Sequence, residues 1–457
     1  MNLVTFYAGL VLGGDMELNR NRYLNVLESW AKSQKPKPLL LWGARQVGKT
    51  HLMLKAAERF FGEYYYLNFE RDKQLALLFR ESLDPEKILQ NLTLYLDKDI
   101  KPESALFIFD EIQECEDALN SLKYFAESPL GFKVMAAGSL LGVKRSKKGF
   151  PVGKVQFLDI HPLNFVEFLE FTGHKKMAQF LAETKLCSPM NEGIHTSLSR
   201  LQREYCWTGG MPEVVAAYAT APNNTEAVRS IQNQIIQSYQ LDFAKHAPSE
   251  LVSKIGAVFQ QIPKLLAKEN KKFSFTSIGT HARARDYSEA LQWLMDVRMV
   301  HKVKNISQID LPLESHAHED TFKVYPLDVG LLGALLEVPA KLVLEQEGIF
   351  SQFKGALAEC FVAEELISYG FSKLYYWTSS GSAEVDFIVH QETQILPLEV
   401  KSGVNLRSKS LSLFGERYPH CNLTRLSTRN FENNGRFKNY PLYSLSVFSN
   451  FARDVTS

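Results

Sequence analysis

The sequence predicts an α/β fold, with a parallel sheet near its start and a second α/β module at its end. Over the first third of the chain, short apolar runs alternate with stretches of helical periodicity, which is typical of a parallel sheet covered on both faces. A glycine-rich loop follows the first apolar run, and two strands near the end carry acidic residues. At 457 residues, roughly two to four domains are expected.

The composition of the chain argues against several kinds of site, among them a globally basic nucleic-acid surface, a zinc site and a membrane anchor. The formal net charge is +1, so nucleic-acid binding would have to rest on local basic patches. The five cysteines lie far apart without a CxxC pair, which argues against a zinc site and fits a cytoplasmic protein. Residues 1–15 are largely apolar but lack a basic leader and are too short to span a bilayer, so we expect a disordered extension or a start-site artefact and no membrane anchor.

The elements of the first domain follow one another at short intervals. An amphipathic helix is expected from Met16 and ends before Pro36. Strands are predicted at residues 39–42, 64–69, 105–109 and 132–137, with a helix over 50–61 after the first of them. These runs are nearly all apolar, as expected for the central strands of a parallel sheet.

The alternation of predicted strands and helices ends after residue 172. Residues 174–250 have helical periodicity, interrupted by the Gly209–Gly210 pair, where we predict a tight turn. Residues 273–306 resemble a winged helix-turn-helix, a module that binds DNA in some proteins and docks proteins in others. A last module begins with a helix and continues with strands at 374–377, 385–389 and 395–400. The expected domains are therefore 16–173, 174–250, 251–345 and 346–457.

The glycine-rich loop carries the strongest chemical signal. Residues 43–50 read GARQVGKT and match GxxxxGK[ST] between a strand and a helix. In such a P-loop the backbone N–H groups and the helix N-terminus face phosphates. Lys49 is expected to reach the β- and γ-phosphates and Thr50 to ligate Mg²⁺. We expect an ATP site formed by Gly43, Ala44, Arg45, Gln46, Val47, Gly48, Lys49, Thr50 and His51.

Acidic residues follow at a spacing that suits the loop. Asp110 lies at the carboxyl end of the third strand, where it can hold Mg²⁺ through water, and Glu111 can orient the attacking water. Ser139 ends the fourth strand and is either a sensor of the γ-phosphate or a turn residue. Arg145 lies in a basic run that either is a solvated loop or contacts phosphate or a neighbouring subunit.

Five segments in order resemble a prokaryotic family of AAA-superfamily ATPases: GARQVGKT, IFDEIQ, GSLLG, HPLNFVEFLEF and TGGMPEVV. The resemblance extends from Met16 over nearly the whole chain and implies an ATPase domain ahead of a C-terminal region. The family usually has Gly-Arg where this chain has Gly153 and Lys154. Lysine lacks the planar fork of an arginine finger, which leaves Arg145 as the candidate. Both a ring-shaped homo-oligomer and a monomer are compatible with this pattern.

Two strands near the end form the second chemical signal. Asp386 lies in EVDFIV, and Glu399 and Lys401 share one face of the next strand, because side chains alternate along a strand. A hairpin of the two strands would bring Asp386 beside Glu399, and Glu359 lies on a helix that could pack alongside. Acids that only keep an edge strand in solution are the structural alternative.

This arrangement resembles the PD-(D/E)xK core of restriction endonucleases. The resemblance implies that Asp386, Glu399 and the accessory Glu359 bind Mg²⁺, while Lys401 positions water. The full expectation is a P-loop NTPase with a parallel sheet, a helical and winged-helix region, and an α/β restriction-endonuclease-like domain. Two functions stay open: ATP-dependent control of a DNA nuclease, or an ATP-dependent regulator whose C-terminal module only docks nucleic acid or protein.

The end of the chain adds a weaker indication of DNA. Between Arg407 and Arg453 basic residues outnumber acidic ones, and aromatic residues are interleaved with them. Basic and aromatic side chains together can bind the backbone and bases of nucleic acid. A mixed surface over core aromatics explains the same pattern equally well.

Overall fold

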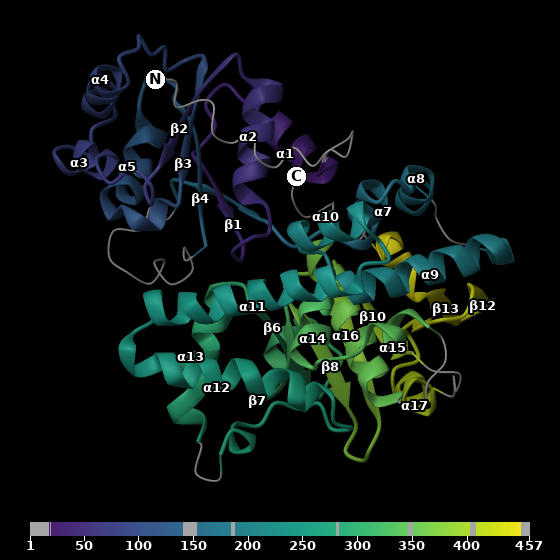
Figure 1. Ribbon diagram of the computed structural model, residues 1–457. Coiled ribbons are helices and arrows are strands. Elements are labelled where there is room, and N and C mark those ends of the chain that lie inside the picture. The colour runs from purple at the N-terminus through teal and green to yellow at the C-terminus, as the bar shows by residue number, and fades with distance from the viewer. Residues whose placement is uncertain are drawn as a thin grey trace. The chain divides into compact units, whose positions relative to one another are not determined.

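The computed structural model describes residues 18, 20–139, 153–183, 188–279, 283–345, 351–402 and 408–448 (Figure 1). They form two compact units. The N-terminal unit comprises Leu18–His161 with Asp296–Arg298, and the C-terminal unit comprises Pro162–Met295 with the chain from Met299 onward. The extension predicted for residues 1–15 lies outside the described residues.

The N-terminal unit is built on a five-stranded parallel sheet with the strand order β2-β3-β4-β1-β5. Its strands are β1 (Leu39–Trp42), β2 (Glu63–Asn68), β3 (Ala105–Asp110), β4 (Lys133–Gly138) and β5 (Gln156–Asp159). The four predicted strands are confirmed as β1 to β4. Every residue of β1 and β3 is buried, which explains why these strands have continuous apolar runs in the sequence. The edge strand β5 was not predicted because its side chains are mostly exposed, so it has no continuous apolar run.

Helices cover both faces of this sheet. They are α1 (Asn21–Lys32), α2 (Lys49–Phe60), α3 (Leu75–Arg80), α4 (Pro85–Leu96) and α5 (Glu116–Glu127). Helices α3, α4 and α5 share one apolar core with the sheet, and Figure 1 shows α1 and α2 on the other side of the strands. Edge-to-face rings of Phe69, Phe79 and Phe109 lie within that core, so the sheet is held by large aromatic contacts.

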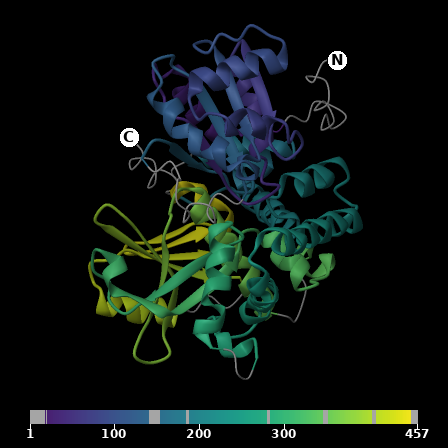
Figure 2. The same cartoon turned by 90° about the vertical axis from the view of Figure 1, so that its left-hand side faces the viewer.

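The C-terminal unit contains an eight-stranded mixed sheet with the order β12-β13-β11-β10-β9-β8-β6-β7. Its strands are β6 (Val300–Ile306), β7 (Ala317–Pro326), β8 (Leu374–Thr378), β9 (Glu384–Gln391), β10 (Gln394–Lys401), β11 (Leu423–Ser427), β12 (Glu432–Asn434) and β13 (Phe437–Pro441). The strands predicted at 374–377, 385–389 and 395–400 are confirmed as β8, β9 and β10. Figure 2 draws the later strands of this sheet in green to yellow.

One feature of this sheet differs from the expected domain layout. Strand β6 pairs with β7 on one edge and with β8, in parallel, on the other. Residues 251–345 and 346–457 therefore share one sheet, because the backbone groups of β6 are hydrogen-bonded to strands from both segments. The winged helix-turn-helix stays a prediction that rests on the order of the elements over residues 273–306.

Helices make up most of the remainder of the C-terminal unit. They are α7 (Phe165–Phe171), α8 (Lys175–Glu183), α9 (Glu192–Thr208), α10 (Pro212–Thr220), α11 (Thr225–His246), α12 (Ser249–Leu266), α13 (Ala284–Asp296), α14 (Val329–Leu335), α15 (Ala340–Leu344), α16 (Ser351–Ser368) and α17 (Lys409–Arg417). The helical periodicity predicted over 174–250 is confirmed by α8 to α11. Within the described ranges, no helix is both long and apolar enough to cross a bilayer.

The predicted turn at Gly209 and Gly210 joins α9 to α10. Gly209 has φ of 73°, and a Cβ atom there would lie 2.2 Å from Oδ1 of Asp328. The Asp328 carboxylate accepts hydrogen bonds from the backbone N–H of Gly210 (2.6 Å) and of Leu331 (2.8 Å). The sequence analysis assigned no chemical role to this turn. In the structure the turn packs the end of α9 against the start of α14.

Candidate functional site

The predicted P-loop lies between β1 and α2. Gln46 and Gly48 have φ of 66° and 92°, so the chain curls through the left-handed region twice before the helix begins at Lys49. A Cβ on Gly43 would lie 2.1 Å from the carbonyl oxygen of Ile160. The glycines at both ends of the motif are therefore required by backbone geometry as well as by phosphate access.

Lys49 points back into the loop. Its Nζ donates to the carbonyl oxygens of Gly43 (2.9 Å) and Ala44 (2.7 Å). Burial lowers the pKa of Lys49 to about 8, against the opposing effect of Glu111 and Asp110. A buried ammonium held by neutral carbonyls is a favourable partner for an anionic phosphate.

The two predicted Mg²⁺ ligands meet directly. Oγ1 of Thr50 donates to Oδ2 of Asp110 at 2.9 Å. The same carboxylate oxygen accepts from the hydroxyl of Tyr66 (2.6 Å), and Nδ2 of Asn68 lies 3.5 Å away. Tyr66 and Asn68 were not predicted as site residues. The register of β2 and β3, which sets Asn68 opposite Asp110, places them there.

Glu111 lies just beyond the strand end with φ of 50°. Its Oε2 accepts a hydrogen bond from Nε2 of Gln113 at 2.6 Å. Burial raises the pKa of the Glu111 carboxyl, and the Gln113 hydrogen bond opposes that rise. Gln113 is thus a further contact of the predicted water-orienting acid that sequence reasoning missed.

The oxygen donors of this site suit Mg²⁺. A hydroxyl and a carboxylate are hard ligands, and Mg²⁺ is usually bound by one or two protein oxygens together with substrate phosphates and water. Thr50 and Asp110 provide those two oxygens within 2.9 Å of each other. The residues present therefore fit a Mg²⁺–nucleotide complex.

A buried arginine ahead of the first helix also contacts the loop. Arg20 is 1% exposed, and its guanidinium donates to the carbonyl oxygens of Val47 (2.9 Å) and His161 (2.7 Å). The hydroxyl of Tyr23 accepts from the N–H of His161 at 3.1 Å. Arg20 thus ties the P-loop to the chain that leaves β5. Nothing in the local sequence pattern distinguishes it from a surface arginine.

Other residues considered for this site have contacts that do not include Lys49, Thr50 or Asp110. Nε2 of His51 lies 3.4 Å from the carbonyl oxygen of Leu18, and Ser139 follows β4 in a half-buried position. Lys154 pairs with Glu127 at 2.7 Å on the surface. Arg145 lies outside the described residues.

The acids predicted near the end of the chain do come together. Lys401 pairs with Glu399 at 2.7 Å, as expected for two side chains on one face of β10. Oδ2 of Asp386 accepts from the N–H of Val400 at 2.8 Å, so the β9 acid lies against β10. Oε2 of Glu359, on α16, accepts from the hydroxyl of Tyr325 at 2.7 Å.

Two lysines that were not predicted for this cluster enter it from earlier in the chain. Nζ of Lys323, on β7, lies 2.6 Å from Oε1 of Glu384, 3.6 Å from Oε2 of Glu359 and 3.8 Å from Oδ1 of Asp386. Lys271 forms an ion pair with Oε1 of Glu359. Against the effect of burial, Lys323 and Lys271 lower the pKa of Glu359 to about 2. Burial raises the pKa of Asp386, reinforced by Glu359 and Glu399.

This arrangement does not fit the Mg²⁺ implied by the nuclease resemblance. Ligands of Mg²⁺ approach to about 2.0–2.1 Å, whereas the Lys323 ammonium already lies among three of the carboxylates. Across the described part of the chain, no three His, Cys, Asp or Glu side chains are grouped so that they could hold a metal ion. In the described arrangement the cluster therefore offers Mg²⁺ no open site.

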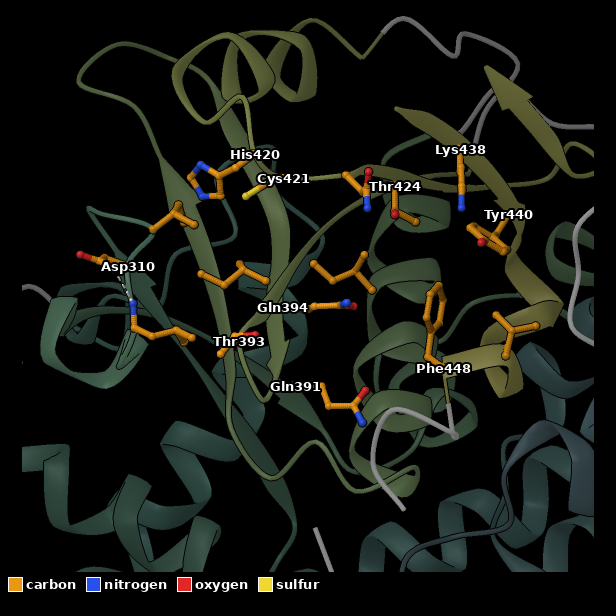
Figure 3. Close-up of a pocket in the computed structure, with 16 residues that line it drawn as sticks. Asp310, Gln391, Thr393, Gln394, His420, Cys421, Thr424, Lys438, Tyr440 and Phe448 are labelled. Carbon is orange, nitrogen blue, oxygen red and sulfur yellow. Dashed lines mark hydrogen bonds between the residues drawn. The ribbon is translucent and has the colours of Figure 1, made fainter. Parts of the chain in front are cut away.

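A pocket of about 730 Å³ lies elsewhere on the C-terminal unit (Figure 3). Its lining includes Gln394 at the start of β10, Thr424 on β11, and Lys438 and Tyr440 on β13. None of the residues predicted for catalysis, nucleotide or metal lines it. Of the basic residues counted near the end of the chain, Lys438 alone is among its lining residues. One lysine gives little attraction for a phosphate backbone, so this pocket adds no support for DNA binding.

Three segments of the chain match models of known families. A model described as an AAA domain matches residues 35–169. Two models described only as domains of unknown function match residues 199–342 (DUF8612) and 354–445 (DUF4143). No curated protein matches the sequence.

Solved structures resemble parts of the chain at low sequence identity. The Walker-type ATPase of Pyrococcus abyssi is 15% identical, with 70% of this chain and 96% of that chain covered and a TM-score of 0.45. The Orc1 protein of Aeropyrum pernix, solved with DNA, is 14% identical, with coverages of 71% and 92% and a TM-score of 0.27. Cdc6p of Pyrobaculum aerophilum is 13% identical, with coverages of 73% and 98% and a TM-score of 0.28. Residues 35–169 thus resemble an AAA domain in sequence, and the loop between β1 and α2 has the geometry of a P-loop.

Proposed function

We propose that this protein binds and hydrolyses ATP with Mg²⁺ in its N-terminal unit, and that hydrolysis controls a C-terminal unit that acts on DNA or is regulated by it. The observation that carries the ATPase part is the contact of Thr50 with Asp110 beside the buried Lys49. Three groups with complementary roles in phosphoryl transfer thus gather where β1 and β3 end.

Each of these side chains has one role in the proposed reaction. Lys49 binds the β- and γ-phosphates, and Thr50 and Asp110 would hold Mg²⁺, which would neutralise charge on the phosphates. Glu111 accepts a hydrogen bond from the attacking water and orients it. Gln113, now bonded to Glu111, sets the position of that carboxylate.

Phosphate release from purified protein with Mg²⁺ and ATP tests this proposal. Lys49→Ala is expected to abolish release, and Glu111→Gln to slow hydrolysis while ATP still binds. Arg59→Ala, an exposed change on α2, serves as the control and should leave the rate unchanged. Persistent hydrolysis in Lys49→Ala would refute the assignment.

Adding DNA to the same assay tests the partner. Stimulation of phosphate release by DNA is expected if the C-terminal unit couples DNA to the ATPase. Hydrolysis that is indifferent to DNA over a range of salt concentrations would instead favour a protein partner, because DNA contacts through phosphates weaken steeply with salt.

A second candidate function is metal-dependent cleavage of DNA by the C-terminal unit, in a state in which Lys323 has left the acids and a metal can enter. It is favoured by the juxtaposition of Asp386, Glu399 and Lys401 on neighbouring strands. Cleavage with Mg²⁺ or Mn²⁺ that disappears in Asp386→Ala would support it. No cleavage with either metal, or cleavage that survives Asp386→Ala, would leave the unit as a non-catalytic docking module.

A further inference from the structure

The acids that resemble a nuclease centre surround a lysine. Lys323 is 1% exposed, and its Nζ contacts carboxylates from two different elements: Glu359 of α16, and Glu384 and Asp386 of β9. Strand β7, which carries Lys323, is hydrogen-bonded to β6, and α12 packs against it. The ammonium is therefore held by regular structure and does not come from a loop.

Several carboxylate oxygens around this ammonium already accept other donors, whereas the buried Oε2 of Glu399 has no hydrogen-bond partner among the described residues. Glu359 uses Oε1 for Lys271 and Oε2 for the hydroxyl of Tyr325. Asp386 uses Oδ2 for the N–H of Val400. A divalent metal would have to displace these partners and would also be repelled by Lys323, since charges interact strongly at such short range in a buried site.

We infer that Lys323 is the resident cation of this carboxylate cluster and that its ammonium takes the place of a divalent metal there. In the described arrangement the cluster is an internal ion-pair network that excludes Mg²⁺. Cleavage by this unit would require Lys323 to leave the acids first. This inference does not depend on the ATPase proposal, because no nucleotide or P-loop residue enters it.

The origin of the neutralising charges supports this assignment. Lys271 and Lys323 both lie within residues 199–342, whereas Glu359, Asp386 and Glu399 lie within residues 354–445. The segment that carries the acids therefore lacks these two compensating charges when taken alone. An uncompensated buried charge is strongly destabilising, so the two segments are electrostatically dependent on each other.

Metal binding by the full-length protein without nucleotide tests the inference. Mn²⁺ binding is measured by electron paramagnetic resonance and calorimetry on the wild type, on Lys323→Met, and on Lys302→Met. Lys302 is the matched control, because it lies on the neighbouring strand β6 and pairs with the exposed Glu319 at 3.6 Å. The wild type and Lys302→Met are expected to bind no Mn²⁺ at this cluster. Lys323→Met should bind one Mn²⁺ there, at least on the order of a hundredfold more tightly than the weakest binding that the titration of the wild type can detect, because a buried positive charge is removed.

Thermal unfolding supplies an independent readout. Mn²⁺ should raise the Tm of Lys323→Met and leave that of the wild type unchanged, since the metal replaces the missing charge. Stoichiometric Mn²⁺ binding by the wild type that is lost in Asp386→Asn would overturn the inference. A folded Lys323→Met protein that binds no Mn²⁺ would overturn it as well. If Lys323→Met does not fold, the wild-type and Asp386→Asn titrations decide the question.

Discussion

At the residue scale, the P-loop depends on a side chain that lies outside the motif. Arg20 donates to Val47 in the loop and to His161 after β5, and it is almost fully buried. These two acceptors are backbone carbonyls, so replacing Arg20 leaves both without this charged donor. The loop's conformation includes two residues with positive φ, which such a contact helps to hold.

We expect Arg20→Met to weaken nucleotide binding more than it slows the bound reaction. The loss of a buried charged donor should cost about 1–3 kcal/mol of stability, and a less ordered loop should raise KM for ATP with a smaller change in kcat. Steady-state phosphate release and chemical denaturation measure the two effects. Arg59→Met on α2 is the exposed control. An unchanged KM with reduced stability would mean that Arg20 serves the fold alone.

The protonation of Lys49 gives ATP binding a predicted pH dependence. Burial brings the pKa of Lys49 to about 8 in the nucleotide-free protein. Above that pH the lysine is neutral and must take up a proton to bind phosphate, so ATP affinity should fall as the pH rises. By linkage, the decrease should approach about tenfold per pH unit. Lys49→Arg, which stays charged, should bind ATP without this decrease in equilibrium titrations, and an identical slope in both proteins would contradict the assignment.

At the element scale, the turn between α9 and α10 should tolerate no side chain at its first glycine. Gly209→Ala places a methyl group against Asp328 at a positive φ and is expected to lower the free energy of unfolding by at least about 2 kcal/mol. Gly256→Ala is the matched control. That glycine lies in α12, and a methyl group on it would meet no neighbouring side chain within 4 Å, so alanine should stabilise the helix by about 0.5–1 kcal/mol. Denaturant unfolding of both variants checks the contrast.

The predicted elements are determined by neighbouring residues in the sequence, whereas the missed ones depend on contacts with distant parts of the chain. Strands β1 and β3 are buried on both faces, so their apolar runs are visible in the sequence. Strand β5 is mostly exposed and is a strand only because β1 pairs with it. Likewise Lys49 and Asp110 were predicted from local motifs. Lys323 reaches the acidic cluster through the pairing of distant strands, which no local pattern reveals.

At the scale of the whole molecule, the two compact units should respond differently to nucleotide. The P-loop lies entirely within the N-terminal unit. Differential scanning calorimetry of Glu111→Gln is therefore expected to show two transitions, and Mg²⁺–ATP should shift only one of them upward. At a ligand concentration of about one hundred times Kd, the shift should correspond to about 2.7 kcal/mol. A single transition that shifts as a whole would show that the units unfold together.

Strand β6 also has a consequence for how such chains can change over generations. Residues 303–306 of β6 pair with residues 374–377 of β8, although the two strands lie in segments that match different family models. A recombination event that exchanged only one of these segments would break the ladder of hydrogen bonds between them and leave a strand edge exposed. We therefore expect the two segments to be inherited together, as a single unit of exchange, even though sequence similarity treats them as separate.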